Sequence, residues 1–579
     1  MQKNHCQLYQ TANLLFCIAL CATGGHLLAS LVVDKIIFNT DAAAPFYQAK
    51  LITQGITIDP KILSFARIPS IFPDLATLIS LTKADPNAGF HIIVARYSWA
   101  IASSLIFLQA EFCILTLSKL ITRMQAITIA SIITIGLVAI NPQFKEAIGL
   151  ILTPLHHGGN IINTYIIGCV ALYWLGRHNS QREATFYFKL LLSAIAISLG
   201  AASNKLLFFT AIIPATTTAA LSFLLVINRG KLEPFFKPIK RRYKLLVLFA
   251  SAILTGFAIP SLINVQCSLP IIIRPLETYP KLFLIAVGNI STILGLVLTI
   301  VLLLFSFFSF QKCLRDNTAT FKEFSKINIK KQFFMGSCFL CISTFSPLGY
   351  TWLLGEPQHF PLRYVIIMIT GISTTSIIIA SLLTHKIEAF LQQRKFSKAK
   401  ILIYLVLGAL SLPRAFSEIS KGRIETIYTN NFSSRKHDLA NLTAKLNSIG
   451  LTHGLSDYWG TELEFISDLS YTNGKKITIE PILNNGEPDF WAHNKYQFMD
   501  ISGQINKYNF VVSLNREFDE SVTKAYGKPE ILLRTPNSPT SILIYSNSFK
   551  KQKIHNILLS KAVGFDRQCN QAKPNFNDR

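Results

Sequence analysis

The stretch LLFCIALCATGGHLLASLVV, residues 14–33, decides the class of this protein. It contains no Asp, Glu, Lys or Arg, and about 20 apolar residues in a helix cover the roughly 30 Å of hydrocarbon in a bilayer. No small-residue cleavage motif stands at its end. We therefore interpret it as an uncleaved first membrane helix and not as a signal peptide.

Similar apolar runs recur along the chain. Half of its 579 residues are hydrophobic, only 15% are charged, and the mean hydropathy is +0.38, whereas soluble domains carry about 25% charged residues. This composition excludes a water-soluble class and predicts a polytopic α-helical membrane protein with about eleven transmembrane helices. The predicted spans are 13–33, 92–118, 124–140, 160–176, 190–203, 206–227, 245–263, 283–310, 334–352, 364–384 and 401–413.

The positive charge is concentrated in the membrane half. Residues 1–413 hold 35 Lys and Arg but 14 Asp and Glu, which is a net charge of +21 out of the total of +25. Three connections rich in Lys and Arg, residues 229–244, 312–331 and 385–400, are expected to be cytoplasmic by the positive-inside rule. The N-terminus is then cytoplasmic, and the region after 413 is extracytoplasmic, in the periplasm if the membrane is a bacterial inner membrane. Because the charge is explained by topology, no nucleic-acid partner is expected.

The C-terminal region has a globular composition. Residues 437–450 show helical spacing, 475–483 and 508–514 alternate like strands, and 531–546 form a pattern typical of a hairpin. We predict a soluble α/β domain over 414–560 and a disordered tail over 561–579. Eight of the ten cysteines lie in or beside apolar segments, and the other two, Cys267 and Cys569, give no disulfide framework.

The first outer loop, residues 34–90, is unusual in its acidic residues. It carries five of the six Asp residues of the membrane half, together with apolar stretches that favour a position on the membrane surface. Carboxylates near an apolar surface are costly unless they are paired or functional. The five are Asp34, Asp41, Asp59, Asp74 and Asp85, of which Asp34, Asp59 and Asp85 fit boundary and turn positions.

Two segments of this loop carry a resemblance to a known family. The segment NTDAAAPFYQAKLITQG, residues 39–55, and the segment PSIFPDLATL, residues 69–78, resemble the outer loop of the membrane-embedded GT-C glycosyltransferases, such as the protein mannosyltransferases and aminoarabinose transferases. The resemblance implies a GT-C-like membrane domain over 1–413 that takes a sugar from a polyprenyl-phosphate carrier. It places the early acidic position at Asp41 and the second at Asp74. Where the family commonly has a charged residue after a middle helix, this chain has Asn204 followed by Lys205.

The chemistry of glycosyl transfer fits a carboxylate at these positions. A base must take the proton of the acceptor while the sugar develops oxocarbenium character, and one carboxylate suffices for a single inverting displacement. Asp41 is the candidate base, and Asp74 could orient the acceptor or hold a divalent metal ion through its oxygens. The alternative for Asp41 is that it caps the helix beginning at AAAPF.

A phosphate-linked donor needs cations or amide donors on the outer side. The candidates are His156 and His157 at the start of a predicted helix, Lys205, and Arg363 at the mouth of the tenth span. For each of them an ordinary interfacial position is an equally simple interpretation. In the C-terminal region, Asp457, Tyr458 and Trp459 in GLSDYW (454–459) could bind a sugar ring, or the two aromatic side chains could belong to the domain core.

These observations favour an integral membrane glycosyltransferase with a lipid-linked sugar donor and a glycan, lipid or protein acceptor at the outer face. A transporter or lipid flippase of cell-envelope precursors is the first alternative, although such proteins normally carry ionisable groups at the bilayer midplane. A non-enzymatic membrane scaffold with an outer binding domain is the second. Eleven helices exceed what anchoring requires.

Overall fold

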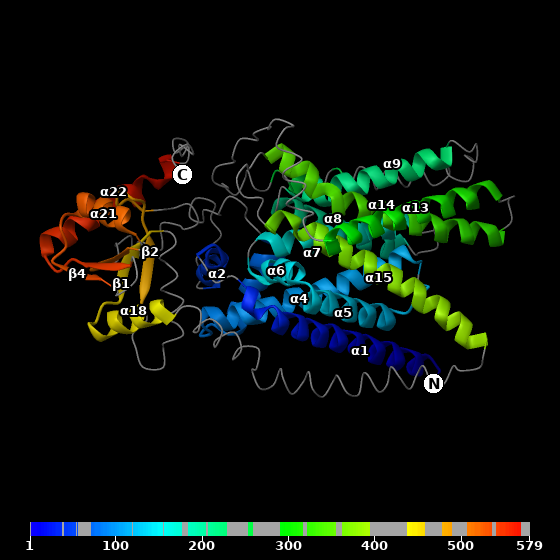
Figure 1. Ribbon diagram of the computed structural model, residues 1–579, viewed down its shortest axis with the longest axis horizontal. Coiled ribbons are helices and arrows are strands. Elements are labelled where there is room, and N and C mark those ends of the chain that lie inside the picture. The colour runs from blue at the N-terminus through cyan, green and yellow to red at the C-terminus, as the bar shows by residue number, and fades with distance from the viewer. Residues whose placement is uncertain are drawn as a thin grey trace.

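A computed structural model gives the structure of this chain. It describes residues 2–36, 40–53, 55, 71–118, 120–154, 156–176, 183–203, 206–227, 250, 253–256, 258, 290–316, 321–354, 362–393, 437–457, 477–488, 507–513, 515–534 and 540–568. These residues form a helical bundle and a separate C-terminal sheet domain, each with its own buried core (Figure 1).

The bundle consists of long, nearly parallel helices (Figure 1). Five described helices contain segments long and apolar enough to cross a membrane, namely Thr11–Leu31, Phe90–Thr116, Arg123–Ile140, Ile293–Cys313 and Ile366–Ile387, and Phe188–Ser203 and Phe208–Ser222 are shorter apolar segments. The chain is thus a multi-pass membrane protein. Its helices are α1 (Gln2–Leu31), α4 (Phe90–Thr116), α5 (Arg123–Ile140), α6 (Pro142–Leu152), α7 (His156–Gly176), α8 (Glu183–Ser203), α9 (Ile213–Ile227), which continues the short π-helix η3 (Phe208–Ile212), α13 (Ile290–Asp316), α14 (Phe321–Leu354) and α15 (Leu362–Gln393).

The segment between α1 and α4 is folded where it is described. It contains η1 (Val33–Lys35), α2 (Thr40–Thr53), the short π-helix η2 (Ile71–Leu75) and α3 (Ala76–Ala84), and the Phe72–Pro73 peptide bond is cis. The helix α2 packs on η2 and α3, and it lies beyond the ends of α1 and α4 in Figure 1. The segment that was expected to face outward is therefore a layer of short helices on one end of the bundle, and we call it the outer layer after that expectation.

Local sequence signals explain where the neighbouring helices begin. Thr122 and Gln125 form a capping box at the start of α5, with side-chain and backbone groups paired in both directions. Asn141 accepts the amide protons of Gln143 and Phe144 at the start of α6, and Pro142 occupies the first helical position, where the missing N–H costs nothing. The connection expected over 141–159 thus contains a helix.

Hydroxyl and amide side chains cross the centre of the bundle as a polar seam. Gln109 Nε2 donates to Thr374 Oγ1 at 3.2 Å, Thr134 Oγ1 donates to Gln109 Oε1 at 3.1 Å, and Thr134 and Ser373 share a hydrogen bond of 3.1 Å. Tyr165 joins through its hydroxyl, 2.5 Å from Thr374 Oγ1. Since all five side chains are buried, the seam satisfies polar groups that hydrocarbon could not.

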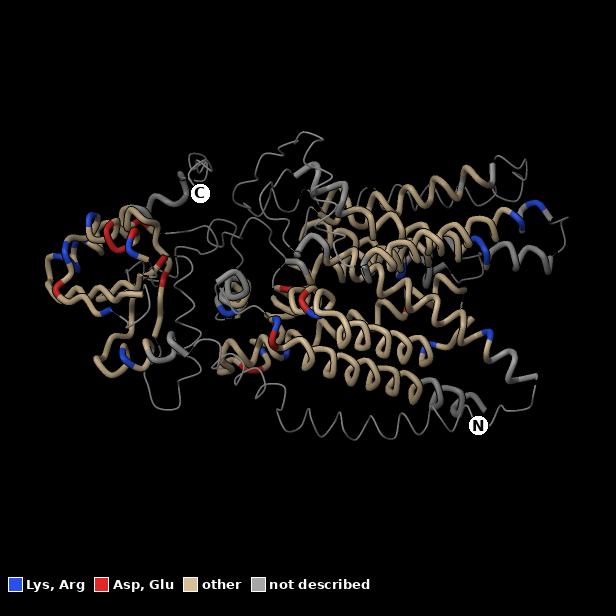
Figure 2. The backbone as a smooth tube through the Cα atoms, in the orientation of Figure 1, with Lys and Arg blue, Asp and Glu red and all other residues tan. Residues whose placement is uncertain are grey.

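Charged residues lie at the two ends of the bundle (Figure 2). Lys and Arg of α13, α14 and α15 mark the end where α1 begins, and Arg315 stands in the last turn of α13. At the other end, Lys35 pairs with Glu146 at 3.4 Å and Lys145 with Asp34 at 2.8 Å. These two exposed ion pairs tie η1 to α6, each contributing about 0–1 kcal/mol.

The C-terminal domain is a five-stranded sheet of order β2-β1-β3-β5-β4. Its strands are β1 (His453–Ser456), β2 (Thr478–Pro481), β3 (Phe510–Ser513), β4 (Ile531–Arg534) and β5 (Ser541–Ile544). The strand β1 is parallel to β2 and β3, whereas β5 is antiparallel to β3 and β4. Two apolar clusters cover the sheet, one with residues of α18 (His437–Ser448) and the other with residues of α21 (Arg516–Tyr526) and α22 (Ser548–Gln568).

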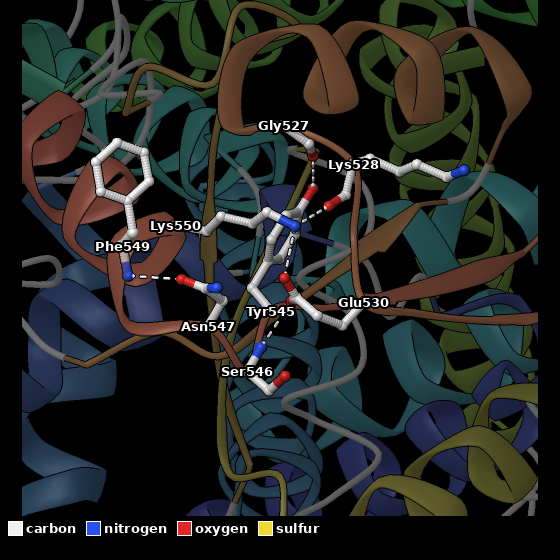
Figure 3. Close-up of polar contacts among 8 residues, drawn as sticks. All are labelled: Gly527, Lys528, Glu530, Tyr545, Ser546, Asn547, Phe549 and Lys550. Atoms are coloured by element: carbon white, nitrogen blue, oxygen red, sulfur yellow. Dashed lines mark hydrogen bonds and ion pairs between the residues drawn. The ribbon is translucent and has the colours of Figure 1, made fainter.

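A polar junction joins the end of α21, the approach to β4 and the start of α22 (Figure 3). Lys550 Nζ donates to the Lys528 carbonyl at 2.6 Å and to Glu530 Oε1 at 2.5 Å. The second oxygen of Glu530 accepts the amide proton of Ser546 at 2.9 Å. Tyr545 Oη reaches the Gly527 carbonyl at 3.2 Å. The charged pair therefore fixes α22 on the edge of the sheet.

The expected fold class is confirmed: a polytopic helical membrane part is followed by a small C-terminal sheet domain. Nine predicted spans coincide with described helices, while the span 401–413 and most of 245–263 lie outside the described residues, so the count of eleven stays a prediction. The expected C-terminal helix, both strands and the hairpin are present. The prediction that a disordered tail begins at residue 561 is wrong, because α22 reaches Gln568 and residues 561–568 are helical.

Candidate active site

Three acidic side chains of the segment between α1 and α4 are described, and of these Asp74, in η2, is buried whereas Asp34 and Asp85 are partly exposed. The Asp74 side chain is only 1% exposed, and its Oδ1 accepts a hydrogen bond of 2.5 Å from the hydroxyl of Tyr97 on α4. Its Oδ2 has no hydrogen-bond partner of regular geometry among the described residues. A buried carboxyl with one regular hydrogen bond is costly in an apolar surrounding, which makes this position a candidate functional site.

The carboxyl lies against the first turn of α7. A Cβ atom on Gly159 would lie 2.4 Å from Asp74 Oδ2, and a Cβ on Gly158 would lie 2.2 Å from the carbonyl oxygen of Ile151. Only glycine leaves room for such approaches. The unpaired amide groups of a helix N-terminus carry a partial positive charge that favours a carboxylate. Gly159 thus lets α7 meet Asp74, whereas Gly158 lets α7 pack on the end of α6.

Two further hydrogen bonds fix the backbone of η2. The amide of Phe72 donates to Ser203 Oγ on α8 at 2.7 Å, and Asn163 Nδ2 on α7 donates to the carbonyl of Phe72 at 2.8 Å. Both Asn163 and Ser203 are buried. The segment is thus attached to α4, α7 and α8 within three residues.

The surroundings of Asp74 change its acidity. Burial raises the pKa of the Asp74 carboxyl from 3.8 to about 7, and the hydroxyl of Tyr97 and the backbone N–H of Gly159 partly offset this rise. Desolvation acts on the charged form and therefore favours the proton. A carboxyl with a pKa near 7 in an outer layer of a membrane protein is typical of groups that take part in acid–base chemistry or in proton-linked conformational change.

The structure defines the backbone position of several predicted residues but not their side chains. Asp41 stands in the first turn of α2, His156 and His157 begin α7, and Arg363 lies in the first turn of α15. The side chains of these four residues, and Lys205 as a whole, lie outside the described residues. Their catalytic and phosphate-binding roles stay predictions. For His156 and His157 the geometry adds a constraint, because the first turn of α7 already faces the carboxyl of Asp74.

No group of three or more His, Cys, Asp or Glu side chains that could hold a metal ion is found among the described residues. The described neighbours of Asp74 are the phenol of Tyr97 and the backbone of Gly159, neither of which is a typical ligand of a divalent cation. A metal ion at Asp74 would therefore need ligands from side chains outside the described part, among which Asp41 is the predicted one.

The other acidic residues of the membrane half take structural positions where they are described. Asp85 pairs with Arg96 at 2.9 Å, and Glu111 pairs with Arg123 through two contacts, one of them 3.3 Å long. Asp34 pairs with Lys145, as noted above. Asp59 lies outside the described residues. These contacts agree with the boundary and turn roles expected for Asp34 and Asp85.

In the sheet domain, Asp457 directly follows β1 and is half-buried. Because β1 and β3 are parallel, their carboxyl ends lie at the same edge, where Ser456 Oγ donates to the carbonyl of Val512 at 2.7 Å. The chain leaves β1 toward β2 on one side and leaves β3 toward α21 on the other, which is the position where open α/β sheets often bind ligands. Tyr458 and Trp459 lie outside the described residues, so sugar binding by this motif stays a prediction.

Sequence reasoning missed the residues that hold η2: Tyr97 donates to Asp74, and Asn163 and Ser203 bind the backbone of Phe72. Tyr97, Asn163 and Ser203 stand in apolar helices without any motif, and only the three-dimensional contacts distinguish them from other polar residues of the spans. The one available signal was the pair Gly158–Gly159 at the start of a helix, which indicates a close approach of another group.

Comparison with known proteins gives a structural similarity alone. No family model and no curated protein matches the chain. The crystal structure of ArnT from Cupriavidus metallidurans bound to undecaprenyl phosphate is similar to it with a TM-score of 0.45 and 9% sequence identity, over 93% of this chain and 99% of that one. The apo structure of the same ArnT has a TM-score of 0.45 and 8% identity, over 94% and 98% of the two chains.

Proposed function

We propose that this protein is an integral membrane glycosyltransferase that moves a sugar from a polyprenyl-phosphate carrier to an acceptor at the outer face of the membrane. The observation that carries the proposal is the buried carboxyl of Asp74, which is 1% exposed and lies in the layer of short helices at one end of the bundle. A buried carboxyl is costly to keep unless it serves a site, and the layer that it anchors lies where the apolar helices end, which is the depth expected for the phosphate of a carrier lipid.

The distribution of charge supports the assignment of sides. Basic residues of α13, α14 and α15 mark the end of the bundle where α1 begins (Figure 2), and basic ends favour the cytoplasm. The layer that contains Asp74 lies at the opposite end, so it faces outward in this orientation. A lipid-linked donor in the outer leaflet would then meet α2 and η2 first.

The reaction needs a base that reaches the acceptor. Asp41 is our candidate, since it stands in the first turn of α2, a helix that packs on the layer holding Asp74. In a single inverting displacement the carboxylate takes the proton of the acceptor hydroxyl, the acceptor oxygen bonds to the anomeric carbon, and the carrier phosphate leaves. The cations that would face the leaving phosphate are His156, His157, Lys205 and Arg363.

The test is a transfer assay with membrane vesicles that contain the full-length protein and supply the acceptors of the native membrane, to which radiolabelled polyprenyl-phosphate sugars are added; vesicles without the protein are the blank. We expect protein-dependent loss of label from the carrier, abolished by Asp41→Asn because the amide cannot accept the proton. The matched control is Asp85→Asn, which removes a carboxylate of the same loop that pairs with Arg96 at the surface, and it should keep the activity of the unmodified protein. Movement of the intact labelled lipid between leaflets without sugar transfer would instead favour a flippase and overturn the proposal.

A further inference from the structure

The five-residue segment η2 joins the outer layer to three helices of the bundle. Phe72 is bound through its amide to Ser203 of α8 and through its carbonyl to Asn163 of α7. Two residues later, Asp74 accepts the hydroxyl proton of Tyr97 of α4 at 2.5 Å. The contacts with the main chain of Phe72 tolerate any side chain at that position, whereas the contact at Asp74 depends on its carboxyl group.

Asp74 is too enclosed to meet a substrate in this arrangement. Its side chain is 1% exposed, the phenol of Tyr97 covers one oxygen, and the backbone of Gly159 lies against the other. A group that touches only protein can affect a reaction only through the residues it holds.

The helix α2 packs on the segment η2 that Asp74 anchors. It also packs on α3, and its inner side is closed by Phe46, which is 4% exposed and packs edge-to-face on Phe90 of α4 with 5.2 Å between ring centroids. Ala49, one turn further along α2, is fully buried. A displacement of η2 from α4 and α7 would remove part of the surface under α2, and it would also move α3, which follows η2 directly.

We propose that Asp74 is a positioning residue: its carboxyl docks η2 on Tyr97 and on the first turn of α7, and this docking places α2 and the Asp41 that α2 carries. The evidence for the docking itself is the set of contacts that Asp74 makes, and it does not depend on the proposed function. The consequence of the docking for catalysis rests on the proposed function, in which Asp41 is the base. The proposal changes the role expected for Asp74 from orienting the acceptor to orienting the helix of the base.

The docking can be measured without any substrate. A cysteine is introduced as Ala49→Cys in the full-length protein in nanodiscs, and the rate of maleimide modification at residue 49 is read by peptide mass spectrometry at pH 6.5. Loss of a buried hydrogen-bond network of this kind is expected to speed the modification by about tenfold or more in Asp74→Ala. Asp74→Asn should stay within about twofold of the parent, because its amide oxygen still accepts the proton of Tyr97.

Two controls separate local docking from general unfolding. A cysteine at the exposed Ser546 of the sheet domain should react at the same rate in all variants. If Asp74→Ala accelerates both positions equally, or leaves residue 49 unchanged, Asp74 does not position α2 and the inference is wrong. Rescue by Asp74→Asn but not by Asp74→Ala identifies the hydrogen bond accepted from Tyr97, and not the charge of residue 74, as the contact that docks η2.

The same variants distinguish this inference from the proposed function. Asp41→Asn should abolish sugar transfer without changing the modification rate at residue 49, because it leaves the contacts of Asp74 intact. If transfer survives Asp41→Asn while Asp74→Ala still exposes residue 49, the docking stands and the assigned base is wrong. If transfer is lost in Asp41→Asn and residue 49 is unaffected by Asp74→Ala, the function stands and the docking fails.

Discussion

Replacement of Asp74 by Asn should remove a pH dependence from the stability of the outer layer. In the folded protein burial raises the pKa of Asp74 from 3.8 to about 7, whereas in an opened outer layer the carboxyl is hydrated and returns toward its ordinary value. Between these two values the folded state binds more protons than the opened state. By linkage, the stability of the layer therefore falls as the pH rises toward 7 and levels off above it.

The size of the effect follows from the two values. One pH unit corresponds to about 1.36 kcal/mol, so the full difference between 3.8 and about 7 amounts to about 4 kcal/mol of destabilisation once the carboxyl is ionised. Most experiments reach only part of this range. Between pH 5.5 and 8.5 the expected loss is about 2 kcal/mol, and Asp74→Asn, which cannot ionise, should not show it.

The assay is thermal unfolding of the unmodified protein and of Asp74→Asn in nanodiscs across this pH range. The difference between the two midpoints is the measured quantity, since the titration of all other groups cancels in it. We expect the unfolding midpoint of Asp74→Asn to rise relative to that of the parent protein as the pH increases from 5.5 to 7.5. Above pH 7.5 the difference between the two midpoints should stay constant. A difference that does not vary with pH would refute the reasoning, because it would mean that Asp74 titrates alike in both states.

Three further substitutions test other contacts of the structure. Tyr97→Phe should lower the stability of the outer layer by about 1–3 kcal/mol, measured by hydrogen exchange of residues 71–84, because the carboxyl of Asp74 loses its one regular donor among the described residues; unchanged exchange would contradict this. Phe46→Ala should cost about 3–5 kcal/mol of local stability and raise exchange in α2 alone, whereas a uniform loss across the bundle would argue against a local layer. Lys550→Ala should raise the pKa of Glu530, which the hydrogen bond from Lys550 now lowers, toward its ordinary value, as NMR titration can show. Since a lowered pKa in the folded state stabilises above the unfolded value, this contribution is lost in acid, and a Glu530 titration unaffected by the substitution would exclude the contact.

The fold could be predicted where one physical rule decides it. Apolar length located the helices of the bundle, and period-two alternation located β2, β3 and the β4–β5 hairpin, because burial of apolar residues dominates in both cases. The helices α6, α21 and α22 and the strand β1 escaped notice. Each is short or mostly polar, and α6 is signalled only by the pair Asn141–Pro142, which marks a helix start as readily as a turn.

The candidate site could be predicted only in part, for a different reason. The concentration of Asp in the first outer loop pointed to Asp74, but its role depends on Tyr97, Gly159 and the segment at Phe72, which lie far apart in the sequence. Sequence spacing cannot report such a contact, since the carboxyl oxygen and the phenol meet through the packing of α3 on α4. Whether a carboxyl is enclosed or open to a substrate is likewise decided by packing.

The polar seam of the bundle has a mechanical consequence. Gln109, Thr134, Ser373, Thr374 and Tyr165 are buried and hydrogen-bonded across four helices. Sliding α15 by one residue past its neighbours would break several of these bonds at once and leave buried polar groups unpaired. These bonds therefore fix the axial positions of the four helices relative to one another. A rearrangement of the short helices α2 and α3, by contrast, would leave these bonds intact, because none of the five residues lies in them.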